Sequence, residues 1–436
     1  MNNKIVFLTC IVFFCVAQSL AEIYDFNMLS KALLDTSPKL KQNEIEMMIA
    51  KENIDVANAG HYPSLRFVSN LERSRKFENM FSPTYVGDDS LTQSDGRYIS
   101  ASLYFTYDIY RFGATDYSLK AAEANMNALS AAKCVREKEN LLSLLEAYSR
   151  VRSSNYQLEY YGKIQKLYIE LYGLTKRLHE SGNLAKTSSL EYAKELADTI
   201  TLIGSIREER ANYLSQIIYL SGINIDENDI LHPLDESTQY YQNITFENSA
   251  TAKQMMSVIS QKQAELSFEK TNYLPAISFY ARYDMYGSSS DSYNEALHDL
   301  EKNGYRFGIS FTLPLFDGFR SDSKVSIKRL ELMQSRLAYE DAKRAYEKEQ
   351  FLINSQISLA KSRLDSVSSG VQSSDELVQA DTLLYDVGEL DRITLLNNQI
   401  NQHKINISLK EAHELLNMNI KKREIMNDKE GKCVAL

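Results

Sequence analysis

The chain has 436 residues, of which 44% are hydrophobic and only 6 are prolines, and its formal net charge is −9. Length alone would favour two or three domains, but no Ser/Gly-rich linker divides the chain, so we expect one integrated body. Basic and acidic residues are interleaved along the helical stretches. This argues against a nucleic-acid partner, because a nucleic-acid groove needs a clustered basic face.

The N-terminus has the features of a secretory signal. A short basic start is followed by an apolar run over 5–16, and Ser19-Leu20-Ala21 then supplies the small-x-small pattern that a signal peptidase requires. We therefore expect residues 1–21 to be a signal peptide. Neither Cys10 nor Cys15 follows the small residue expected before a lipidated cysteine, so lipidation is not favoured. The rest of the chain has no apolar run near 18 residues, so no transmembrane helix is predicted.

Two cysteines follow the signal. Cys134 falls within a predicted long helix and Cys433 within a polar C-terminal tail. A disulfide between them is compatible with the sequence, but the pattern favours two separate thiols.

The first half alternates helical and strand patterns. Apolar residues recur at three and four over 26–58, which predicts a helix, and Pro63 stops it. A strand over 65–72, a polar loop over 82–96 and a strand over 98–110 make a hairpin. A helix over 116–180 ends at a glycine cap at Gly182, and another runs over 186–220. A polar connector over 223–248 carries no clear order signal.

The second half repeats this plan. A helix is predicted over 249–270, strands over 277–285 and 305–313, a loop over 287–304, and helices over 322–386 and 391–425, with a disordered tail over 426–436. Pro314 loosens the end of the last strand, Asp-Gly at Gly318 turns the chain, and Ser321 or Asp322 caps the next helix. The turn glycines Gly113 and Gly318, and the later pair Gly182 and Gly388, keep a common offset of roughly 205 residues. We interpret 22–248 and 249–425 as duplicated halves with hairpins at about 62–112 and 275–316 and long helices at about 116–222 and 322–425.

The strands indicate a membrane environment. Apolar residues occupy the odd positions from Tyr305 to Leu315, and small or polar residues occupy the even positions up to Thr312. An exported chain with such strands and no predicted helical span points to an outer-membrane barrel. Four strands cannot close one, since roughly eight is the smallest number that does. Bare strand edges are not tolerated in lipid, so strands from several copies must share one barrel.

The chain resembles the TolC-type outer membrane factors, the exit ducts of tripartite efflux pumps and type I secretion systems. The resemblance rests on Tyr-Leu-Pro at 273–275, on Leu-Pro-Leu-Phe-Asp-Gly-Phe-Arg at 313–320, and on Tyr-Asp-Val-Gly-Glu-Leu-Asp at 385–391 followed by Leu-Leu-Asn at 395–397. It implies an α+β fold in a homotrimer, with a 12-stranded outer-membrane barrel in lipid and a periplasmic barrel of long helices. It also implies a periplasmic adaptor protein and an inner-membrane pump of the RND or ABC type as partners, in a Gram-negative envelope.

The resemblance implies two groups of site residues and three turn residues. The helix-pair tips would dock the adaptor, and the sequence after the second tip would hold the entrance shut. The docking residues are Gly182, Asn183, Leu184, Gly388 and Leu390; the gate residues are Tyr385, Glu389, Asp391, Thr394 and Asn397; the strand-to-helix turns are Gly113, Pro314 and Gly318. Two aspartates that form cation-selecting rings in the best-known member are replaced here by Thr394 and Asn397.

Several alternatives remain open. Glu389 and Asp391 are either a shifted cation-attracting ring or solvated charges at a helix start. Tyr385 is either a gate contact or simple packing between helices. The whole chain is either a passive duct or a structural tether or adhesin of the cell envelope, although two matched tips favour the duct. The six histidines are scattered, and no catalytic motif appears, so we expect no enzyme activity, metal or cofactor.

Overall fold

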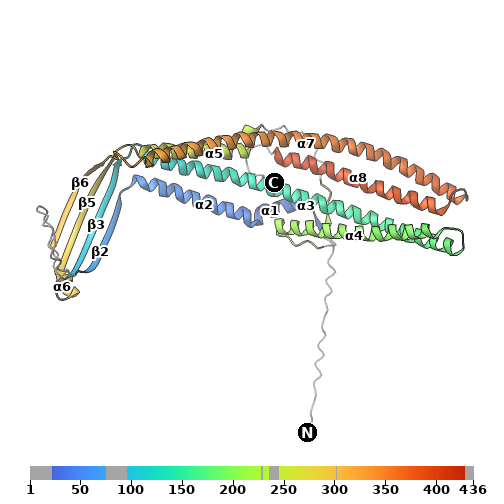
Figure 1. The fold of residues 1–436 in the computed structure, drawn as a ribbon, viewed down its shortest axis with the longest axis horizontal. Helices are drawn as coiled ribbons and strands as arrows, with labels where there is room; N and C mark the ends of the chain where they lie inside the picture. The colour runs from blue at the N-terminus through green and yellow to red at the C-terminus, as the bar shows by residue number, and fades with distance from the viewer. Residues whose placement is uncertain (1–21, 75–95, 227–228, 235–244, 301, 428–436) are drawn as a thin grey trace, which may run out of the picture. The chain divides into compact units, whose positions relative to one another are not determined.

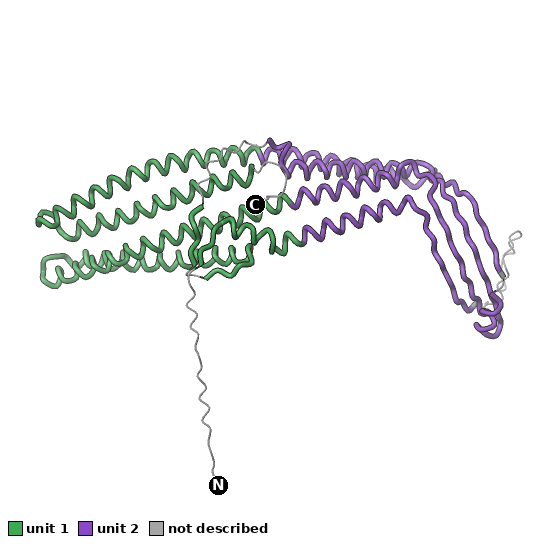
Figure 2. The backbone as a smooth tube through the Cα atoms, turned by 180° about the vertical axis from the view of Figure 1, so that it is seen from behind, with its two compact units in different colours: residues 1–41, 134–244, 347–436 green, residues 42–133, 245–346 purple. Residues whose placement is uncertain are grey.

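The computed structural model describes residues 22–74, 96–226, 229–234, 245–300 and 302–427. These residues form two compact units, shown in Figure 2: residues up to 41, 134–244 and 347–436 make unit 1, and residues 42–133 and 245–346 make unit 2. The signal peptide, most of the predicted loop over 82–96 and most of the C-terminal tail lie outside the described residues. Among the described residues, no helix is long and apolar enough to cross a lipid bilayer.

Helices dominate both units (Figure 1). The longest are α3 (Ala114–Glu180) and α7 (Arg320–Asp386), and α4 (Lys186–Ser221) and α8 (Arg392–Met426) follow them after tight turns. Helices α2 (Pro38–Asn58) and α5 (Ala250–Thr271) are of intermediate length. The long helices lie within about two residues of the predicted limits, because their apolar period is long and uninterrupted by proline.

Unit 2 contains an antiparallel sheet of four strands in the order β2-β3-β5-β6. The strands are β2 (Ser64–Ser74), β3 (Gly96–Tyr110), β5 (Ala276–Ser289) and β6 (Lys302–Thr312). The register pairs Leu65 with Phe105, Phe105 with Ala281 and Ala281 with Phe307. Because side chains alternate along a strand, this register gathers the apolar odd positions on one face. Phe67, Phe307 and Phe311 on that face are 64–68% exposed.

The opposite face of the sheet is polar. Asp284 is its centre: it accepts from the Ser102 hydroxyl at 2.6 Å and from Arg282, and Arg306 lies 3.7 Å away. Both Asp284 and Ser102 are buried, so the carboxylate is satisfied by neighbours on three strands. The alternation of a polar and an apolar face predicted for the strand from Tyr305 is therefore confirmed, and the register extends it across the sheet.

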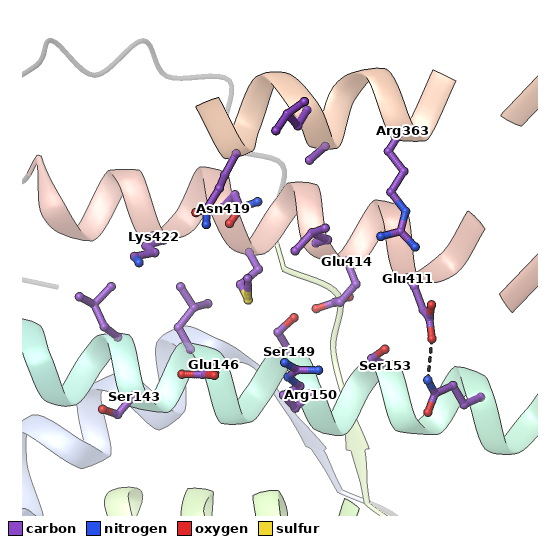
Figure 3. Close-up of a pocket in the computed structure, with 18 residues that line it drawn as sticks. Ser143, Glu146, Ser149, Arg150, Ser153, Arg363, Glu411, Glu414, Asn419 and Lys422 are labelled. Carbon is purple, nitrogen blue, oxygen red and sulfur yellow. Dashed lines mark hydrogen bonds between the residues drawn. The ribbon is translucent and has the colours of Figure 1, made fainter. Parts of the chain in front are cut away.

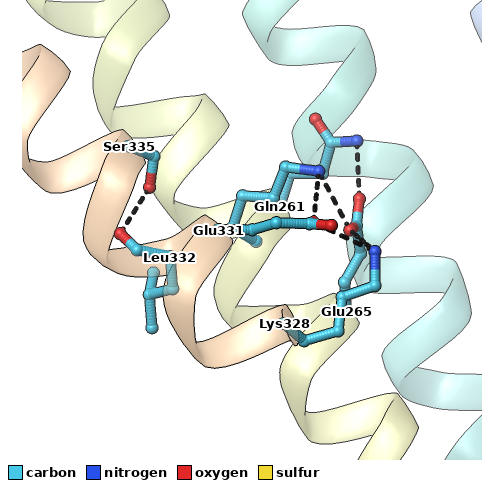
Figure 4. Close-up of polar contacts among 7 residues, drawn as sticks. Gln261, Glu265, Lys328, Glu331, Leu332 and Ser335 are labelled. Carbon is cyan, nitrogen blue, oxygen red and sulfur yellow. Dashed lines mark hydrogen bonds and ion pairs between the residues drawn. The ribbon is translucent and has the colours of Figure 1, made fainter. Parts of the chain in front are cut away.

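A polar network joins α5 to α7 within unit 2 (Figure 4). Lys262 lies 3.1 Å from Glu265 and 3.2 Å from Glu331, and Lys328 lies 2.9 Å from Glu265 and 3.0 Å from Glu331. The hydrogen bond from Lys328, followed by that from Lys262, lowers the pKa of Glu331. Burial alone would raise the pKa of Glu265, but hydrogen bonds from Lys328 and Lys262 outweigh it and lower that pKa. Each charge thus has two partners of opposite sign.

Unit 1 contains a core that ties the N-terminal segment to α3. Two-residue strands β1 (Ile23–Tyr24) and β4 (Ile230–Leu231) pair in parallel, and α1 (Phe26–Thr36) packs beside them. The fully buried Tyr148 of α3 donates its hydroxyl to the carbonyl of His232 at 2.6 Å. This hydrogen bond links α3 directly to the segment containing β4.

The one integrated body expected from the sequence is instead two compact units. Five further expectations need correction. The helix expected over 26–58 is two helices, because Ser37 precedes Pro38 and the residue before a proline is pushed out of the helical region. The connector over 223–248 contains β4 and the 3-10 turn η2 (Phe246–Asn248). The loop over 287–304 contains the helix α6 (Tyr293–His298) and the start of β6. Asp317, rather than Ser321 or Asp322, caps α7. Cys134 is disulfide-bonded, so the preference for a separate thiol at this position was wrong.

Two of these differences have a clear local cause. The Asp317 carboxylate accepts from the backbone N–H groups of Arg320 and Ser321 at 3.1 and 2.9 Å. It can reach both because Gly318 and Phe319 each adopt a positive φ, of 69° and 64°, which turns the chain back on itself. A Cβ at Gly287 would overlap the carbonyl oxygen of Ala296, so this glycine lets α6 lie directly against β5.

Candidate functional site: the paired helix tips

Two tight turns at the same end of unit 1 connect the long helices (Figure 1). The first tip is the turn 181–185 between α3 and α4, and the second tip is the turn 387–391 between α7 and α8. Gly182 and Gly388 have φ of +78° and +81°, a conformation that favours glycine. Backbone bonds close both turns: Asn183 N–H donates to Leu178 at 2.8 Å, and Glu389 N–H donates to Leu384 at 2.9 Å.

The first tip has two more closing contacts. A ring nitrogen of His179 lies 3.1 Å from the carbonyl oxygen of Leu184, and the Asn183 amide donates to the Ser181 hydroxyl at 3.2 Å. Asn183 is exposed and Leu184 is half-buried. The predicted docking residues of the first tip therefore lie together on one hydrogen-bonded turn.

At the second tip, Asp391 is a helix cap. Its carboxylate accepts from the Thr394 backbone N–H at 3.0 Å and from the Thr394 hydroxyl at 2.7 Å. The hydroxyl bond, followed by the backbone bond, lowers the pKa of Asp391. Both carboxylate oxygens are engaged in this way, so the local geometry matches the helix-start interpretation of Asp391. Glu389 is exposed, and Leu390 beside it is half-buried.

Tyr385 takes part in a contact between three helices. The Arg392 guanidinium lies 5.3 Å from the centroid of its ring, a distance at which a cation is attracted to an aromatic face. The same guanidinium donates to Glu170 of α3 at 2.7 and 3.0 Å. Glu170, Tyr385 and Arg392 thus join α3, α7 and α8 beside the tips, and we call them the tip latch.

Asn397 extends the connection to α4. Its amide nitrogen donates to the Tyr192 hydroxyl at 2.8 Å. The structure therefore brings Tyr385, Asp391, Thr394 and Asn397 to one end of unit 1. Sequence analysis missed Glu170, Arg392 and Tyr192, because their partners are about 200 residues away along the chain and no local pattern indicates the pairing.

Farther along the helices from the tips, a cavity of about 730 Å³ lies between α3, α7 and α8 (Figure 3). Its charged lining residues are equally divided between acids and bases: Glu146, Glu411, Glu414, Arg150, Arg363 and Lys422. Glu414 also pairs with Arg152 at 2.9 Å, and both side chains are only 5–6% exposed. Burial raises the pKa of Glu414, although Arg152 opposes this effect. Among the described residues, no group of three or more His, Cys, Asp or Glu side chains could hold a metal ion.

Comparison with known proteins decides the family. The sequence profile of outer membrane efflux proteins matches residues 29–203 and 247–414. The chain belongs to the outer membrane efflux protein family. The two matched segments together cover well over half of the chain.

Solved structures of outer membrane channels have the same fold. The Neisseria gonorrhoeae MtrE channel in its open state superposes with a TM-score of 0.76 at 15% identity, over 94% of this chain and 90% of MtrE. The Campylobacter jejuni CmeC channel gives 0.74 at 15% identity, over 93% and 86%. The Vibrio cholerae outer membrane protein VceC gives 0.71 at 16%, over 91% and 95%. No curated protein sequence matches this chain.

Proposed function

We propose that this outer membrane efflux protein is a passive exit duct, and the sheet of unit 2 carries this proposal. One face of the sheet is apolar and exposed, and the other is polar around Asp284. Among the described residues, the edge strands β2 and β6 have one neighbouring strand each. Exposed edges and an apolar face are both unfavourable in water, and a closed barrel in lipid removes both problems.

The barrel requires several copies of the chain. Four strands per copy are too few, and three copies would supply the 12 strands of the channels in this family. In such a trimer β2 of one copy pairs with β6 of the next, the apolar face contacts outer-membrane lipid, and the polar face lines the pore. The tips of unit 1 would then form the periplasmic entrance.

The tips serve two roles in this proposal. The turns around Gly182, Asn183, Leu184, Gly388 and Leu390 dock a periplasmic adaptor, which brings an inner-membrane pump of the RND or ABC type. The tip latch holds the entrance closed until docking, with Tyr385, Arg392 and Glu170 as its contacts. Energy comes from the pump, and the duct itself performs no chemistry.

The first test is conductance of the purified protein in a planar lipid bilayer. We expect ion-conducting openings that are rare in the wild type and frequent once Arg392→Met weakens the tip latch, and an Arg392→Met variant that inserts without conducting would exclude the duct. Phe307→Arg places a charge on the apolar face and should cost about 2–4 kcal/mol of insertion free energy. Ser310→Arg on β6 places the same charge on the polar face and should insert normally. Equal loss in both variants would contradict the proposed orientation of the sheet.

A second experiment identifies the partner. A photo-crosslinking residue at Asn183 or Leu390 should capture the adaptor in cells. An adaptor partnered with a proton-driven pump would indicate small-molecule efflux, and one partnered with an ABC exporter would indicate type I secretion. Absence of any adaptor at both tips would contradict the docking role.

A further inference from the structure

Helices α3 and α8 meet along a series of contacts that runs from the cavity to the tips. In order these are Arg152 with Glu414, Gln157 with Glu411 at 2.6 Å, Tyr160 with His403, the apolar cluster around Ile164 and Leu396, and Glu170 with Arg392. We call this series the α3–α8 seam. At the cavity, the seam ends in the buried Arg152–Glu414 ion pair. At the tips, it ends in the half-exposed Glu170–Arg392 pair of the tip latch.

His403 lies in the middle of the seam. Its ring is 5.9 Å from the Tyr160 ring, and its Nδ1 is buried without a hydrogen-bond partner among the described residues. The nearby cation is Lys163 of α3, itself 2.8 Å from Glu159. On the α7 side, Asp375 is engaged by the amide of Gln402, the residue before His403, at 2.6 Å. The position therefore accepts a neutral imidazole but offers no acceptor for a second N–H.

We infer that His403 makes the α3–α8 seam sensitive to protons, so that mild acidification weakens the seam between the buried Arg152–Glu414 pair and the tips. The physical cause is the cost of placing an imidazolium in a half-buried position, beside Lys163 and without an acceptor for Nδ1. Under the proposed duct function, on which this consequence rests, weakening the seam favours opening of the entrance.

The direction of the effect follows from proton linkage. Burial, followed by repulsion from Lys163, lowers the pKa of His403 below its ordinary value of 6.5. The closed seam therefore binds fewer protons than a separated one. The contribution of neutral His403 to the stability of the closed seam is complete above pH 6.5. This contribution is lost as the pH falls through that value toward the lowered pKa. At pH 5.5 the closed-to-open ratio can fall by at most about tenfold, because a histidine of ordinary pKa is then about nine-tenths protonated.

The test is amide hydrogen exchange of the full-length purified protein at pH 7.5 and pH 5.5, after correction for the intrinsic rate. Peptides covering 157–168 and 396–407 should exchange several-fold faster at pH 5.5 in the wild type. His403→Gln cannot gain a proton and should lose this response. His413→Gln is the matched control, since it removes an exposed histidine from the same helix and should keep the response. Lys163→Met, which removes the repelling cation, should reduce the response without abolishing it.

Two results would overturn the inference: protection of the seam that does not change with pH, or a pH response that persists in His403→Gln. Conductance is measured separately on the same preparations. A seam that loosens with acid in a protein that forms no pore would support the proton-sensitive contact while excluding the duct. A conducting protein whose seam does not respond to acid would support the duct while excluding the proton-sensitive contact.

Discussion

Arg392, at the start of α8, donates from Nε and Nη2 to the same carboxylate oxygen of Glu170 on α3, at 3.0 and 2.7 Å. Its guanidinium also lies over the Tyr385 ring of α7. One side chain is thus shared by three helices within a few residues of the second tip. The two side chains are 35% and 44% exposed, so the pair contributes at most about 1 kcal/mol.

Replacing Arg392 should therefore favour the open entrance. We expect Arg392→Met to lose up to about 1 kcal/mol of closed-state stability, a several-fold increase in open probability in bilayer recordings. Lys194→Met is the control, because it removes an exposed pair with Asp198 within α4. An unchanged open probability in Arg392→Met, or the same change in the control, would contradict the latch.

The buried Arg152–Glu414 pair should contribute more to the free energy of unfolding than the half-exposed Glu170–Arg392 pair does. Arg152→Met leaves Glu414 buried without its cation and removes the bond from Arg152 to the Leu231 carbonyl at 2.6 Å. We expect a loss of about 3–5 kcal/mol in the free energy of unfolding, measured in denaturant. The double variant Arg152→Met with Glu414→Leu should recover much of this loss, because no uncompensated charge remains. If the double variant were as unstable as the single one, the cost would lie in packing rather than in charge.

The α5–α7 network predicts a pH window. The pKa values of Glu265 and Glu331 are lowered in the folded protein, so their contribution is complete above about pH 4.5 and is lost as the pH falls through the folded values. Burial alone would lower the pKa of Lys262, but hydrogen bonds to Glu265 and Glu331 outweigh it and raise that pKa. The pKa of Lys328 is also raised, chiefly by its hydrogen bond to Glu265. The lysine contribution is therefore complete below about pH 10.5 and is lost above it.

Glu331→Gln tests this window. The variant should be less stable than the wild type near neutral pH, and the difference should shrink as the pH falls below 4.5, measured by thermal unfolding. Glu376→Gln is a suitable control, since Glu376 lies on α7 and contacts only the Gln372 amide among the described residues. A difference that stays constant down to pH 2 would show that the network contributes no charge-dependent stability.

The turn glycines give a prediction about backbone strain. Gly388→Ala forces a left-handed residue to carry a Cβ, and we expect a loss of about 1–2 kcal/mol even though no atom lies within 4 Å of that Cβ. Gly370→Ala, inside α7 and equally uncrowded, should instead stabilise the protein by about 0.5–1 kcal/mol. Denaturant unfolding of the two variants would measure both signs. If Gly388→Ala stabilised the protein as Gly370→Ala does, the second tip would accommodate a Cβ without backbone strain.

The sequence by itself determined the elements whose signal is local. The alternation from Tyr305 to Thr312 required a strand with one apolar face, and the three-four spacing after Asp116 required a long helix. The position of Gly388 was likewise readable, because a tight turn needs a positive φ within a few residues of the helix end. These features depend on neighbours in the chain, so a single sequence contains them.

Only the tertiary structure decided which distant residues meet. Strands β1 and β4 have two residues each and exist because Ile23 pairs with Ile230, far along the chain. Glu170 and Arg392 are ordinary surface charges in the sequence and become a latch only where α3 and α8 lie together. His403 is one of six scattered histidines in the sequence, and only the fold places it against Tyr160 with no partner for its buried Nδ1 among the described residues. The period of a helix specifies which face is apolar, but not which partner covers it, and that partner sets the charge and burial of each site.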